Sequence, residues 1–310
     1  MTNLPKIIIV TINWNGITDT RACLQSLLKN SFKNWEVLVV DNASTQPEAQ
    51  TLKNEFINEP KITILQNQKN LGFCGGNNTG VKFAFEKIKN FDYLLFLNND
   101  TEVASDFLEK IILPFYQDEK LGAIGAKVFW QKQPDKFHSM GGIINLYKGW
   151  WFCGGSLHTG QQQTCPEKID FISGCALCLT KKALQLTGGF DEDYFYYHED
   201  VDLGLRLRKT GFELGFADSA HVWHKEGAAV GGQKLSQTTA FYDTRNMFLL
   251  IRKHGTWWQK IIFTIFKLYV LIANLFLHRE YKFFISRLKG LVWHLTHRVK
   301  KYTKPDYLSR

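Results

Sequence analysis

A short acidic segment preceded by aromatic residues contains the side chains best suited to acid–base chemistry. Glu199, Asp200 and Asp202 follow three aromatic residues, 195–197, at the predicted start of a helix. Carboxylates are favoured there by the helix dipole, and Asp202 and Arg206 are one turn apart, where they can pair. A carboxylate beside aromatic side chains can serve as a general base, because partial desolvation tunes its pKa. Taken alone, the segment is better explained as a solvated, salt-bridged helix start, so function must be argued from the rest of the chain.

The elements that would position this segment belong to an alternating pattern of strands and helices in the first hundred residues. The β-branched and apolar runs that we interpret as strands are residues 6–12, 35–40, 62–65 and 93–97. Helices are predicted at residues 18–28 and 78–89. Near-continuous apolar strands separated by helices indicate a parallel sheet covered on both faces, which is an α/β fold.

Polar side chains follow the predicted strands at the points where the strands end. They are Thr11, Asn13 and Asn15 at the first strand, Asp41 and Asn42 at the second, and Asn98, Asn99 and Asp100 at the fourth. A glycine-rich loop, residues 70–78, follows the third strand. Each group alone could be a turn or a helix cap, but ligands of parallel α/β sheets bind beyond the carboxyl ends of the strands. Four polar ends at one edge therefore predict a ligand site.

The glycine-rich loop argues against two common nucleotide-binding classes. It lacks the G-x-G-x-x-G pattern of dinucleotide-binding folds, and the chain contains no G-x-x-x-x-G-K-[ST] phosphate loop. Both absences count against a dehydrogenase and a P-loop enzyme. Asp41, at the end of the second strand, can still hold a ribose or a base edge, as an acidic residue does in nucleotide-binding α/β folds.

Taken in order, these motifs resemble family 2 of the inverting nucleotide-sugar glycosyltransferases, and most closely its rhamnosyltransferase-like bacterial members. The resemblance covers about residues 6–246, and the segments that carry it are 39–44, 70–78, 97–100 and 189–202. They resemble the family's nucleotide-binding strand end, its N-x-G-F-x-x-G-N-N loop, its D-x-D-type metal motif and its acceptor-side segment with the catalytic base. The resemblance implies the GT-A fold, a Rossmann-like and mostly parallel sheet flanked by helices.

The resemblance also implies roles for individual residues. Asp41 would contact the base or ribose of the nucleotide, and Asp200 would be the general base. Asp100 would ligate a divalent cation, Mg²⁺ or Mn²⁺, that bridges the diphosphate of the donor, and His224 would complete the metal site. Arg245 belongs to a Tyr-x-x-Arg-Asn pattern that would support the phosphates or a closing loop.

Two larger sets of residues complete the expected site. The donor-binding residues are expected to be Thr11, Asn13, Asn15, Asp41, Asn42, Asn70, Gly72, Phe73, Gly76, Asn77, Asn98, Asn99 and Arg245. The acceptor-side residues are expected to be Trp150, Trp151, Gly174, Glu199 and Asp202. The two tryptophans could stack on sugar rings or simply belong to the core, and both alternatives stay open.

One position departs from the family pattern. The first residue of the metal motif is Asn98, so Asp100 is its only carboxylate. Mg²⁺ keeps several waters and takes oxygens from substrate phosphates, so one carboxylate can suffice. The same departure motivates an alternative function, a catalytically silent subunit that binds nucleotide sugars within a polysaccharide assembly complex.

The main hypothesis is transfer of a hexose to a hydroxyl group with inversion. A base on the face opposite the leaving group takes the proton of the acceptor, and a cation stabilises the charge that develops on the diphosphate. By resemblance, the donor is dTDP-rhamnose or a UDP-sugar. The acceptor is a glycan or a lipid-linked oligosaccharide in the biosynthesis of surface polysaccharide of a bacterial cell envelope.

Charge is divided unevenly along the chain. The formal net charge is +9, but the residues from 245 onward hold 14 Lys and Arg against two acids, Glu280 and Asp306. The first 244 residues hold 24 Lys and Arg against 27 Asp and Glu, a net charge of −3. The excess positive charge therefore lies in a tail that is also rich in large apolar residues. This combination favours an anionic membrane surface as a partner over nucleic acid.

The tail is predicted to form two amphipathic helices, residues 257–277 and 281–300. The polar residues that recur along one stripe of the first helix are Lys260, Thr264, Lys267, Asn274 and His278. Lys267 would lie near the middle of a spanning helix at a high energetic cost, so helices lying on the membrane surface are favoured. The alternative is a pair of helices packed on the catalytic domain or on a second subunit.

The expected organisation is a catalytic domain at 1–250, with a nucleotide-sugar half at 1–100 and an acceptor-side half at 101–250, followed by the tail at 251–310. No secretory signal is apparent, because the first apolar run is short and ends in polar residues. The expected location is the cytoplasm, peripheral on the inner face of the plasma membrane. Six cysteines are too sparse for a disulfide scaffold.

Overall fold

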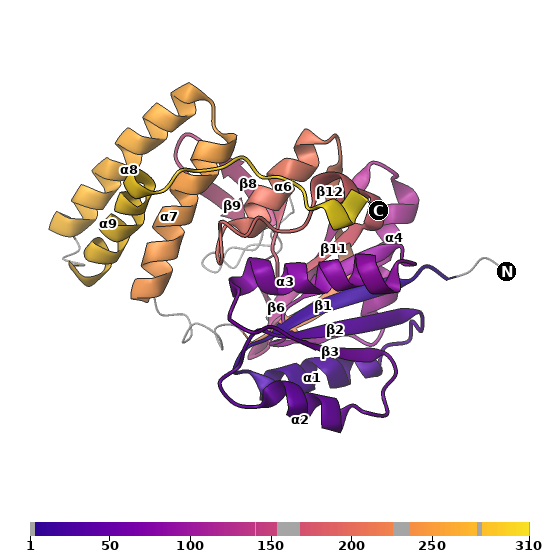
Figure 1. Cartoon of the computed structure of the whole chain (residues 1–310). Coiled ribbons are helices and arrows are strands. Elements are labelled where there is room, and N and C mark those ends of the chain that lie inside the picture. Colours follow the sequence, from indigo (N-terminus) through magenta and orange to yellow (C-terminus); the bar gives the residue numbers. More distant parts are fainter. Residues whose placement is uncertain (1–3, 140, 154–167, 226–235, 278–280, 310) are drawn as a thin grey trace.

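A mixed β-sheet flanked by helices forms the centre of the molecule (Figure 1). The computed structural model describes residues 4–139, 141–153, 168–225, 236–277 and 281–309. In chain order, the strands of the central sheet are β1 (Ile7–Asn13), β2 (Trp35–Asp41), β3 (Ile62–Gln66), β4 (Tyr93–Leu97), β5 (Thr101–Val103), β6 (Leu121–Trp130), β7 (Gln133–Ser139), β11 (Ala176–Thr180) and β12 (Glu213–His224). The four strands predicted from the sequence are confirmed.

The strand order of the sheet separates a parallel half from a mixed half. The order is β3-β2-β1-β4-β11-β6-β12-β5, and β7 pairs with β6. Strands β3, β2, β1 and β4 are parallel, as predicted, whereas β11 is antiparallel to both of its neighbours. The register of β1 and β2 places Asn13 beside Asp41. Polar residues that are distant in sequence therefore meet at the carboxyl edge of the parallel half.

Helices cover both faces of the sheet, and each face has its own hydrophobic core. One face carries α1 (Ile17–Leu28), α2 (Glu48–Glu55) and α4 (Phe107–Gln117), and the other carries α3 (Gly72–Phe83), α5 (Lys181–Thr187) and α6 (Glu199–Lys209). Strand β1 serves both cores, because Ile7 and Ile9 pack on one face while Ile8 and Val10 pack on the other. This alternation is the two-residue period of a strand buried on both faces.

Two helices differ from the sequence-based prediction. Helix α3 begins at Gly72 rather than at residue 78, and it continues as a π-helical turn at Ala84–Ile88. The glycine-rich segment is therefore mostly the first two turns of a helix and not a loop. Helix α2 was not predicted, because only one side of its short polar sequence is buried, through Ala49 and Leu52.

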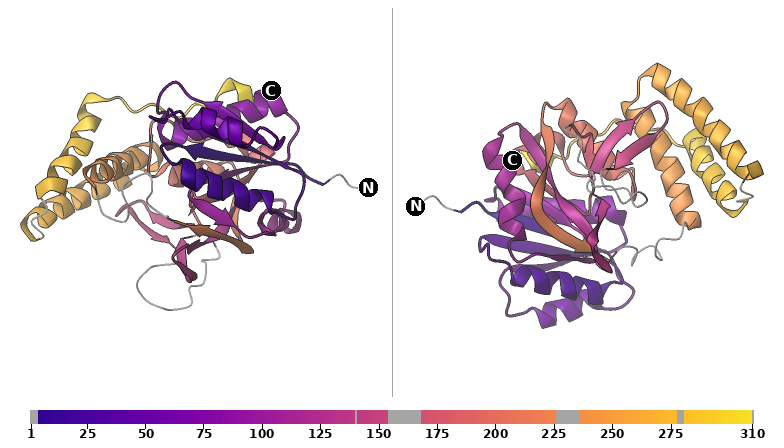
Figure 2. Two further views of the ribbon diagram at one scale, coloured as in Figure 1. Left: turned by 90° about the horizontal axis from the view of Figure 1, so that it is seen from below. Right: turned by 180° about the vertical axis from the view of Figure 1, so that it is seen from behind.

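The C-terminal third contributes three long helices beside the sheet (Figures 1 and 2). They are α7 (Gln237–His254), α8 (Trp257–Leu277) and α9 (Tyr281–Thr296). The two predicted tail helices are present, but the expected domain boundary after residue 250 falls inside α7. A second, three-stranded sheet joins β10 (Phe171–Ile172), β8 (Gly141–Asn145) and β9 (Trp150–Cys153). Within the described ranges, no helix is both long and apolar enough to cross a membrane.

The chain end returns from α9 to the sheet domain as an extended segment (Figure 1). The Tyr302 ring lies 4.2 Å from the guanidinium carbon of Arg206 on α6, and Lys304 Nζ donates to the Gln185 carbonyl at 2.6 Å. Leu308, in the short 3₁₀ turn Asp306–Ser309, is almost completely buried. The tail therefore packs on the catalytic domain at both of its ends.

Candidate functional site

The carboxyl ends of β1, β2 and β4 are joined by one buried hydrogen-bond network. Asn13 Nδ2 donates to Asp41 Oδ2 at 2.8 Å and to Glu48 Oε2 at 2.8 Å. Thr20 Oγ1 donates to Asn13 Oδ1 at 2.7 Å and accepts from Asn99 Nδ2 at 2.9 Å. The structure thus connects the polar ends of the first, second and fourth predicted strands, with Thr20 as the link to the fourth.

Asp41 also organises the turn after β2. Its Oδ1 accepts from Ser44 N at 3.1 Å, and its Oδ2 accepts from Ser44 Oγ at 2.7 Å. Asn15 lies on the other side of this turn, where its N–H donates to Ser44 Oγ at 2.9 Å. Thr11 is completely buried, and its hydroxyl has no hydrogen-bond partner among the described residues. Asp41 is therefore a turn cap in this structure, and its contact with a nucleotide stays a prediction.

Asn42 holds the segment that leads into α3. Its Nδ2 donates to Asn70 Oδ1 and to the Gly72 carbonyl, both at 3.0 Å. Its Oδ1 accepts from Leu71 N at 3.1 Å, and Asn70 Oδ1 in turn accepts from Gly72 N at 2.8 Å. The side-chain amides of Asn42 and Asn70 and the N–H groups of Leu71 and Gly72 therefore all have hydrogen-bond partners within the protein.

The start of α3 is hydrogen-bonded to Phe195, one of the three aromatic residues that precede the acidic segment. Phe73 N donates to the Phe195 carbonyl at 2.7 Å, and Cys74 N donates to the same oxygen at 3.3 Å. Gly72 has φ +70°, and a Cβ at this position would lie 2.5 Å from that carbonyl oxygen, so only glycine fits. The first N–H groups of the helix thus donate to a protein carbonyl and are not available to a phosphate. This helix start instead positions the residues that precede the acidic segment.

Gly76 and Asn77 pack the same helix against the sheet. A Cβ on Gly76 would lie 2.9 Å from Ile12 Cδ1, so a larger residue would push α3 away from β1. Asn77 is buried, and its Nδ2 donates to the Phe73 carbonyl at 3.1 Å. Both residues support the site through helix packing, and their expected contacts with the donor stay a prediction.

The residues expected to hold a metal form a carboxylate–imidazole pair. His224 Nε2 lies 3.0 Å from Asp100 Oδ1, because β12 pairs with β5 directly after the fourth strand. Burial favours the neutral ring, but the side chains of Cys175 and Asp100 raise the pKa of His224 to about 11. Asn98 lies beside this pair, with its N–H donating to the Cys175 carbonyl at 2.9 Å. No group of three or more potential ligands from His, Cys, Asp and Glu occurs in the part of the chain that the structure describes.

Asp200 lies next to the residues that precede β11. Its Oδ2 accepts from Gly174 N at 3.2 Å, and its Oδ1 accepts from Val201 N at 2.8 Å. Burial raises the pKa of Asp200, while these hydrogen bonds and the nearby His198 act in the opposite direction. A Cβ on Gly174 would lie 3.3 Å from Phe73 Cζ, so the glycine permits a close approach between α3 and the Asp200 site.

Glu199 and Asp202 differ from Asp200 in their surroundings. Glu199 is buried, its Oε2 has no hydrogen-bond partner among the described residues, and burial and the Asp200 charge raise its pKa well above the usual range. Asp202 is buried and paired with Arg206 Nε at 2.7 Å and His254 Nε2 at 2.6 Å. The predicted Asp202–Arg206 pair is confirmed and anchors α6, while the acceptor-side roles of Glu199 and Asp202 stay predictions.

Arg245 binds the backbone of the residues that lead into the acidic segment. Its Nη2 donates to the backbone carbonyls of Asp193 and Tyr194, and its Nε donates to Asn246 Oδ1 at 2.7 Å. The guanidinium therefore holds residues 193–194 in place, and its expected contact with the donor stays a prediction. Trp150 and Trp151 lie on β9, and their side chains fall outside the described part of the chain.

Sequence reasoning missed two buried polar residues that support the site. Thr20 and Glu48 complete the network around Asn13. An acid directly after a proline marks the first turn of a helix, so Glu48 could have been found from the sequence. Thr20 lies within an ordinary helical pattern, and only its tertiary contacts single it out. Asn246, the last residue of the Tyr-x-x-Arg-Asn pattern, contacts Tyr196 ahead of the acidic segment.

The three parts of the site lie at one edge of the sheet. Gly174, which binds Asp200, precedes Cys175, and the Cys175 carbonyl accepts from Asn98 N. Asn99 then connects this position to the network around Asn13 and Asp41. An acid at the end of β2, a carboxylate–imidazole pair and a desolvated carboxylate at one sheet edge define a group-transfer enzyme of the α/β class.

Comparison with known proteins specifies this class further. The family model described as "Glycosyl transferase family 2" matches residues 7–186, more than half of the chain. The chain therefore belongs to glycosyl transferase family 2. It is 25% identical over 270 residues to N-acetylglucosaminyl-diphospho-decaprenol L-rhamnosyltransferase of Mycobacterium tuberculosis, covering 81% of this chain and 86% of that protein. It is 24% identical over 228 residues to dTDP-rhamnosyl transferase RfbF of Shigella flexneri, covering 72% of each.

Solved structures show the same fold. A mannosyltransferase from Pyrobaculum calidifontis, in complex with GDP-Man and Mn²⁺, superposes with a TM-score of 0.58 at 14% identity, covering 96% of this chain and 77% of that one. GalNAc-T7, with UDP, GalNAc and Mn²⁺, superposes with a TM-score of 0.65 at 14% identity, covering 98% of this chain and 60% of that one. The expected GT-A fold and the family resemblance are confirmed.

Proposed function

We propose that this glycosyltransferase moves a sugar, with inversion, from a nucleotide-diphosphate donor to a hydroxyl of a glycan or lipid-linked acceptor in surface-polysaccharide biosynthesis. The observation that carries the proposal is the position of Asp200, which is bonded to Gly174 beside the Asn98–Asp100 segment. The names of the two rhamnosyltransferase relatives support dTDP-rhamnose as the donor, with a UDP-sugar as the alternative. The decaprenol-linked substrate in one of those names supports a lipid-linked acceptor.

Asp200 acts as the general base in this proposal. Its raised pKa makes the carboxylate a better proton acceptor than a solvated aspartate, while its two hydrogen bonds keep the charged form accessible. The acceptor oxygen attacks the anomeric carbon as its proton moves to Asp200, and the bond to the diphosphate breaks on the opposite face. One carboxylate is enough for this single displacement, so Glu199 is not required as a second base.

The Asp100–His224 pair fits a divalent cation that is bound together with the donor, if the cation displaces the proton that His224 shares with Asp100 in the free protein. One carboxylate oxygen and one imidazole nitrogen lie at 3.0 Å from each other, and Mn²⁺ accepts both ligand types, while Mg²⁺ prefers the oxygen. Two protein ligands leave room for diphosphate oxygens and water. Bound there, the cation would supply charge stabilisation for the departing diphosphate. We propose metal-dependent transfer with Mn²⁺ or Mg²⁺ on this basis.

The test is the substitution Asp200→Asn. Turnover should fall by about 10²–10⁴, the usual contribution of a positioned general base, while donor binding stays nearly intact. Asp218→Asn, at an exposed position of β12, is the matched control and should keep full activity. Transfer or donor hydrolysis by the wild-type protein with Mg²⁺ or Mn²⁺ would exclude the catalytically silent alternative. An Asp200→Asn protein with near-full transfer activity would show that the base is misassigned.

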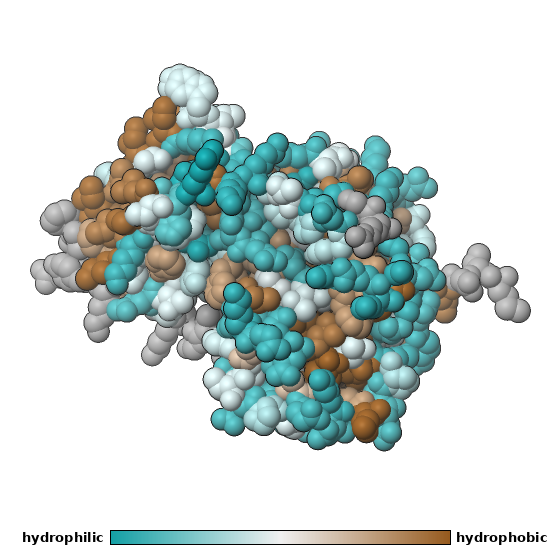
Figure 3. Space-filling model, viewed as in Figure 1, coloured by the Kyte–Doolittle hydropathy of each residue, from teal (hydrophilic) through white to brown (hydrophobic). Residues whose placement is uncertain are grey.

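The tail presents an apolar surface that fits a membrane. The exposed apolar side chains of α8 are Trp257, Trp258, Ile261, Ile262, Ile265, Leu268, Tyr269 and Ile272. Those of α9 are Ile285, Leu288, Val292 and Leu295. Figure 3 shows apolar residues gathered on the outer side of these helices. Monomeric soluble proteins rarely expose a contiguous patch of this kind.

The orientation of α8 explains why its apolar side faces outward. Lys267, one of the predicted polar stripe, lies against the body of the protein, since a Cβ on Gly149 would lie 3.1 Å from Lys267 Cε. Burial lowers the pKa of Lys267, and Asp243 acts in the opposite direction. Among the described residues on or directly after the two helices, the exposed basic ones are Lys260, Lys289, Arg298, Lys300 and Lys301. We propose that this surface docks the protein on an anionic leaflet.

Vesicle sedimentation tests the docking proposal. Binding to anionic vesicles should weaken as salt rises, because each Lys or Arg near such a surface contributes about 1 kcal/mol, and apolar insertion should leave a salt-resistant remainder. Trp257→Ala with Ile265→Ser should remove that remainder. Ile57→Ser, which changes an exposed apolar residue of the sheet domain, is the control. A wild-type protein that ignores vesicles would instead indicate an oligomer interface, and extraction only by detergent would indicate a spanning segment.

A further inference from the structure

Three of the four residues that precede the base-bearing helix have an unfavourable backbone. Phe195, Tyr197 and His198 have φ values of +64°, +73° and +68°, in the left-handed region that non-glycine residues avoid. Helix α6 begins directly after them, and Asp200 is its second residue. Such a conformation persists only where surrounding contacts enforce it. The direction in which Asp200 points therefore depends on whatever holds this segment, 193–198.

One side-chain amide binds three backbone carbonyls of this segment. Asn246 Nδ2 donates to the carbonyl oxygens of Tyr194 at 2.9 Å, Tyr196 at 2.6 Å and Tyr197 at 2.8 Å. The carbonyl between them, that of Phe195, is bound by the first N–H groups of α3. Three acceptors share the two hydrogens of a single amide, so no other residue type of this size can replace it.

The orientation of this amide is fixed by its neighbour. Arg245 Nε donates to Asn246 Oδ1 at 2.7 Å, so the amide oxygen faces the guanidinium and the nitrogen faces the three carbonyls. Asn246 is completely buried, so water cannot take over these bonds. The buried Asn246 amide thus acts as a clamp on the segment that delivers the general base.

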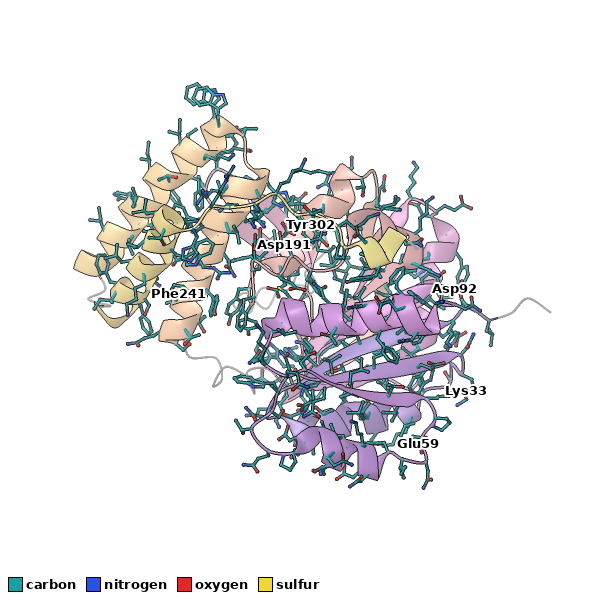
Figure 4. The ribbon with its side chains drawn as sticks, viewed as in Figure 1. Lys33, Glu59, Asp92, Asp191, Phe241 and Tyr302 are labelled. Atoms are coloured by element: carbon teal, nitrogen blue, oxygen red, sulfur yellow. The ribbon has the colours of Figure 1, made fainter. Side chains whose placement is uncertain are left out.

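The clamp belongs to the helices of the C-terminal third. Arg245 and Asn246 lie in α7, and His294 Nε2 of α9 is 2.8 Å from the Arg245 carbonyl oxygen. A Cβ on Gly290 of α9 would lie 2.8 Å from the Phe241 carbonyl oxygen, so these two helices are in close backbone contact. Figure 4 labels Phe241, which lies on α7, and Asp191, which lies in the sheet domain. The tail helices therefore buttress the segment in addition to presenting the docking surface.

We propose that Asn246 is a positioning residue for the general base Asp200, acting through segment 193–198. This inference rests on the proposed function, in which Asp200 accepts the proton of the acceptor. Asn246 does not contact donor or acceptor itself. Its loss should misplace Asp200 without changing the residues that bind the nucleotide.

A double-mutant cycle with Asp200 tests the proposal. Asn246→Ala should lower kcat by about 10–100-fold, because a displacement of about 1 Å can cost about 10²-fold, while the donor dissociation constant changes by less than about threefold. In the Asp200→Asn background the same substitution should change the residual rate by less than about threefold, since the group it positions is already gone. Rates are normalised to the concentration of protein that binds donor, which corrects for any unfolded fraction.

Asn30→Ala is the matched control for the loss of a buried amide. Asn30 Nδ2 also donates to a backbone carbonyl, that of Ala104, but at the opposite edge of the sheet. Its loss should lower Tm without changing kcat per donor-binding molecule. Equal losses from Asn246→Ala in the wild-type and Asp200→Asn backgrounds would overturn the proposal, as would a wild-type kcat for the Asn246→Ala protein. If Asp200→Asn alone kept its rate, the proposed base would be wrong and not only the clamp.

Discussion

The two acids that flank Val201 are expected to respond oppositely to neutralisation. Asp200 accepts two hydrogen bonds from backbone N–H groups, and burial raises its pKa. Asp202 accepts from Tyr194 Oη at 3.2 Å and pairs with Arg206 and His254. The substitution Asp202→Asn should therefore destabilise the fold, whereas Asp200→Asn should leave stability unchanged or increase it.

The magnitude for Asp202 follows from its surroundings. Arg206 and His254 overcome the effect of burial and lower the pKa of Asp202 from 3.8 to about 2, which corresponds to roughly 2–3 kcal/mol of stabilisation by the ionised form. Removing one partner of a buried ion pair costs about 3–5 kcal/mol. Arg206 keeps its hydrogen bonds to the carbonyls of Thr187 and Gly189, which places the loss at the lower end. We expect a loss of about 3 kcal/mol, or roughly 5–10 °C in Tm.

The pH dependence has a definite sign. The folded pKa of Asp202 lies below the unfolded value, so the folded state binds fewer protons between these two values. The stabilisation is complete above about pH 4 and is lost as the pH falls toward 2. Urea unfolding of the wild-type and Asp202→Asn proteins at pH 7, 4 and 3 measures the difference. The gap in unfolding free energy should be widest at pH 7 and should shrink by about half at pH 3.

Two results would refute this reasoning. A gap that stays constant from pH 7 to pH 3 would show that the loss comes from altered packing and not from the charge of Asp202. An Asp202→Asn protein as stable as the wild type would show that the pair with Arg206 contributes nothing net. Asp200→Asn is the neighbouring control, since it removes a charge from the same helix turn without removing an ion pair.

Two further outcomes are expected. Asp100→Ala should weaken donor binding by roughly tenfold or more with Mn²⁺ present and change it little without metal, which titration calorimetry measures; equal losses in both conditions would indicate a structural role. A chain that ends at Lys301 should lose about 3 kcal/mol of unfolding free energy, because it lacks buried Leu308 and the Tyr302 ring over Arg206. Thermal unfolding measures that loss, and an unchanged Tm would show that the returning segment is not packed in solution.

Local sequence patterns were sufficient for the parallel half of the sheet. Three of its four strands, β1, β2 and β4, are apolar runs long enough to be buried on both faces, and the polar residues that follow mark where each of them ends. Parallel strands place these ends at one edge, so Asn13, Asp41 and Asp100 could be assigned to one site before their contacts were known. The start of α6 was equally local, because acids at its first turn and the Asp202–Arg206 spacing both follow helical geometry.

The structure decided what local patterns leave open. The glycines after Asn70 were interpreted as a loop. In the structure a helix begins at Gly72, and its first N–H groups donate to the Phe195 carbonyl, more than a hundred residues away in sequence. Arg245 was expected to support the phosphates or a closing loop, and only the structure shows that its guanidinium binds the backbone carbonyls of Asp193 and Tyr194. The tail helices were predicted to be amphipathic, but the sequence did not indicate which side of each helix would face the rest of the protein.

The sequence by itself therefore determined the strands of the parallel half and the polar edge, and it led to the proposal of Asp200 as the general base, because each depends on residues within one or two turns or one strand. Only the tertiary structure decided how that base is held. A backbone carbonyl is the same group in every residue, so its partner cannot be read from residue types. The contacts of Asn246, Arg245 and the first turn of α3 with segment 193–198 exist only once the sheet has brought these elements together.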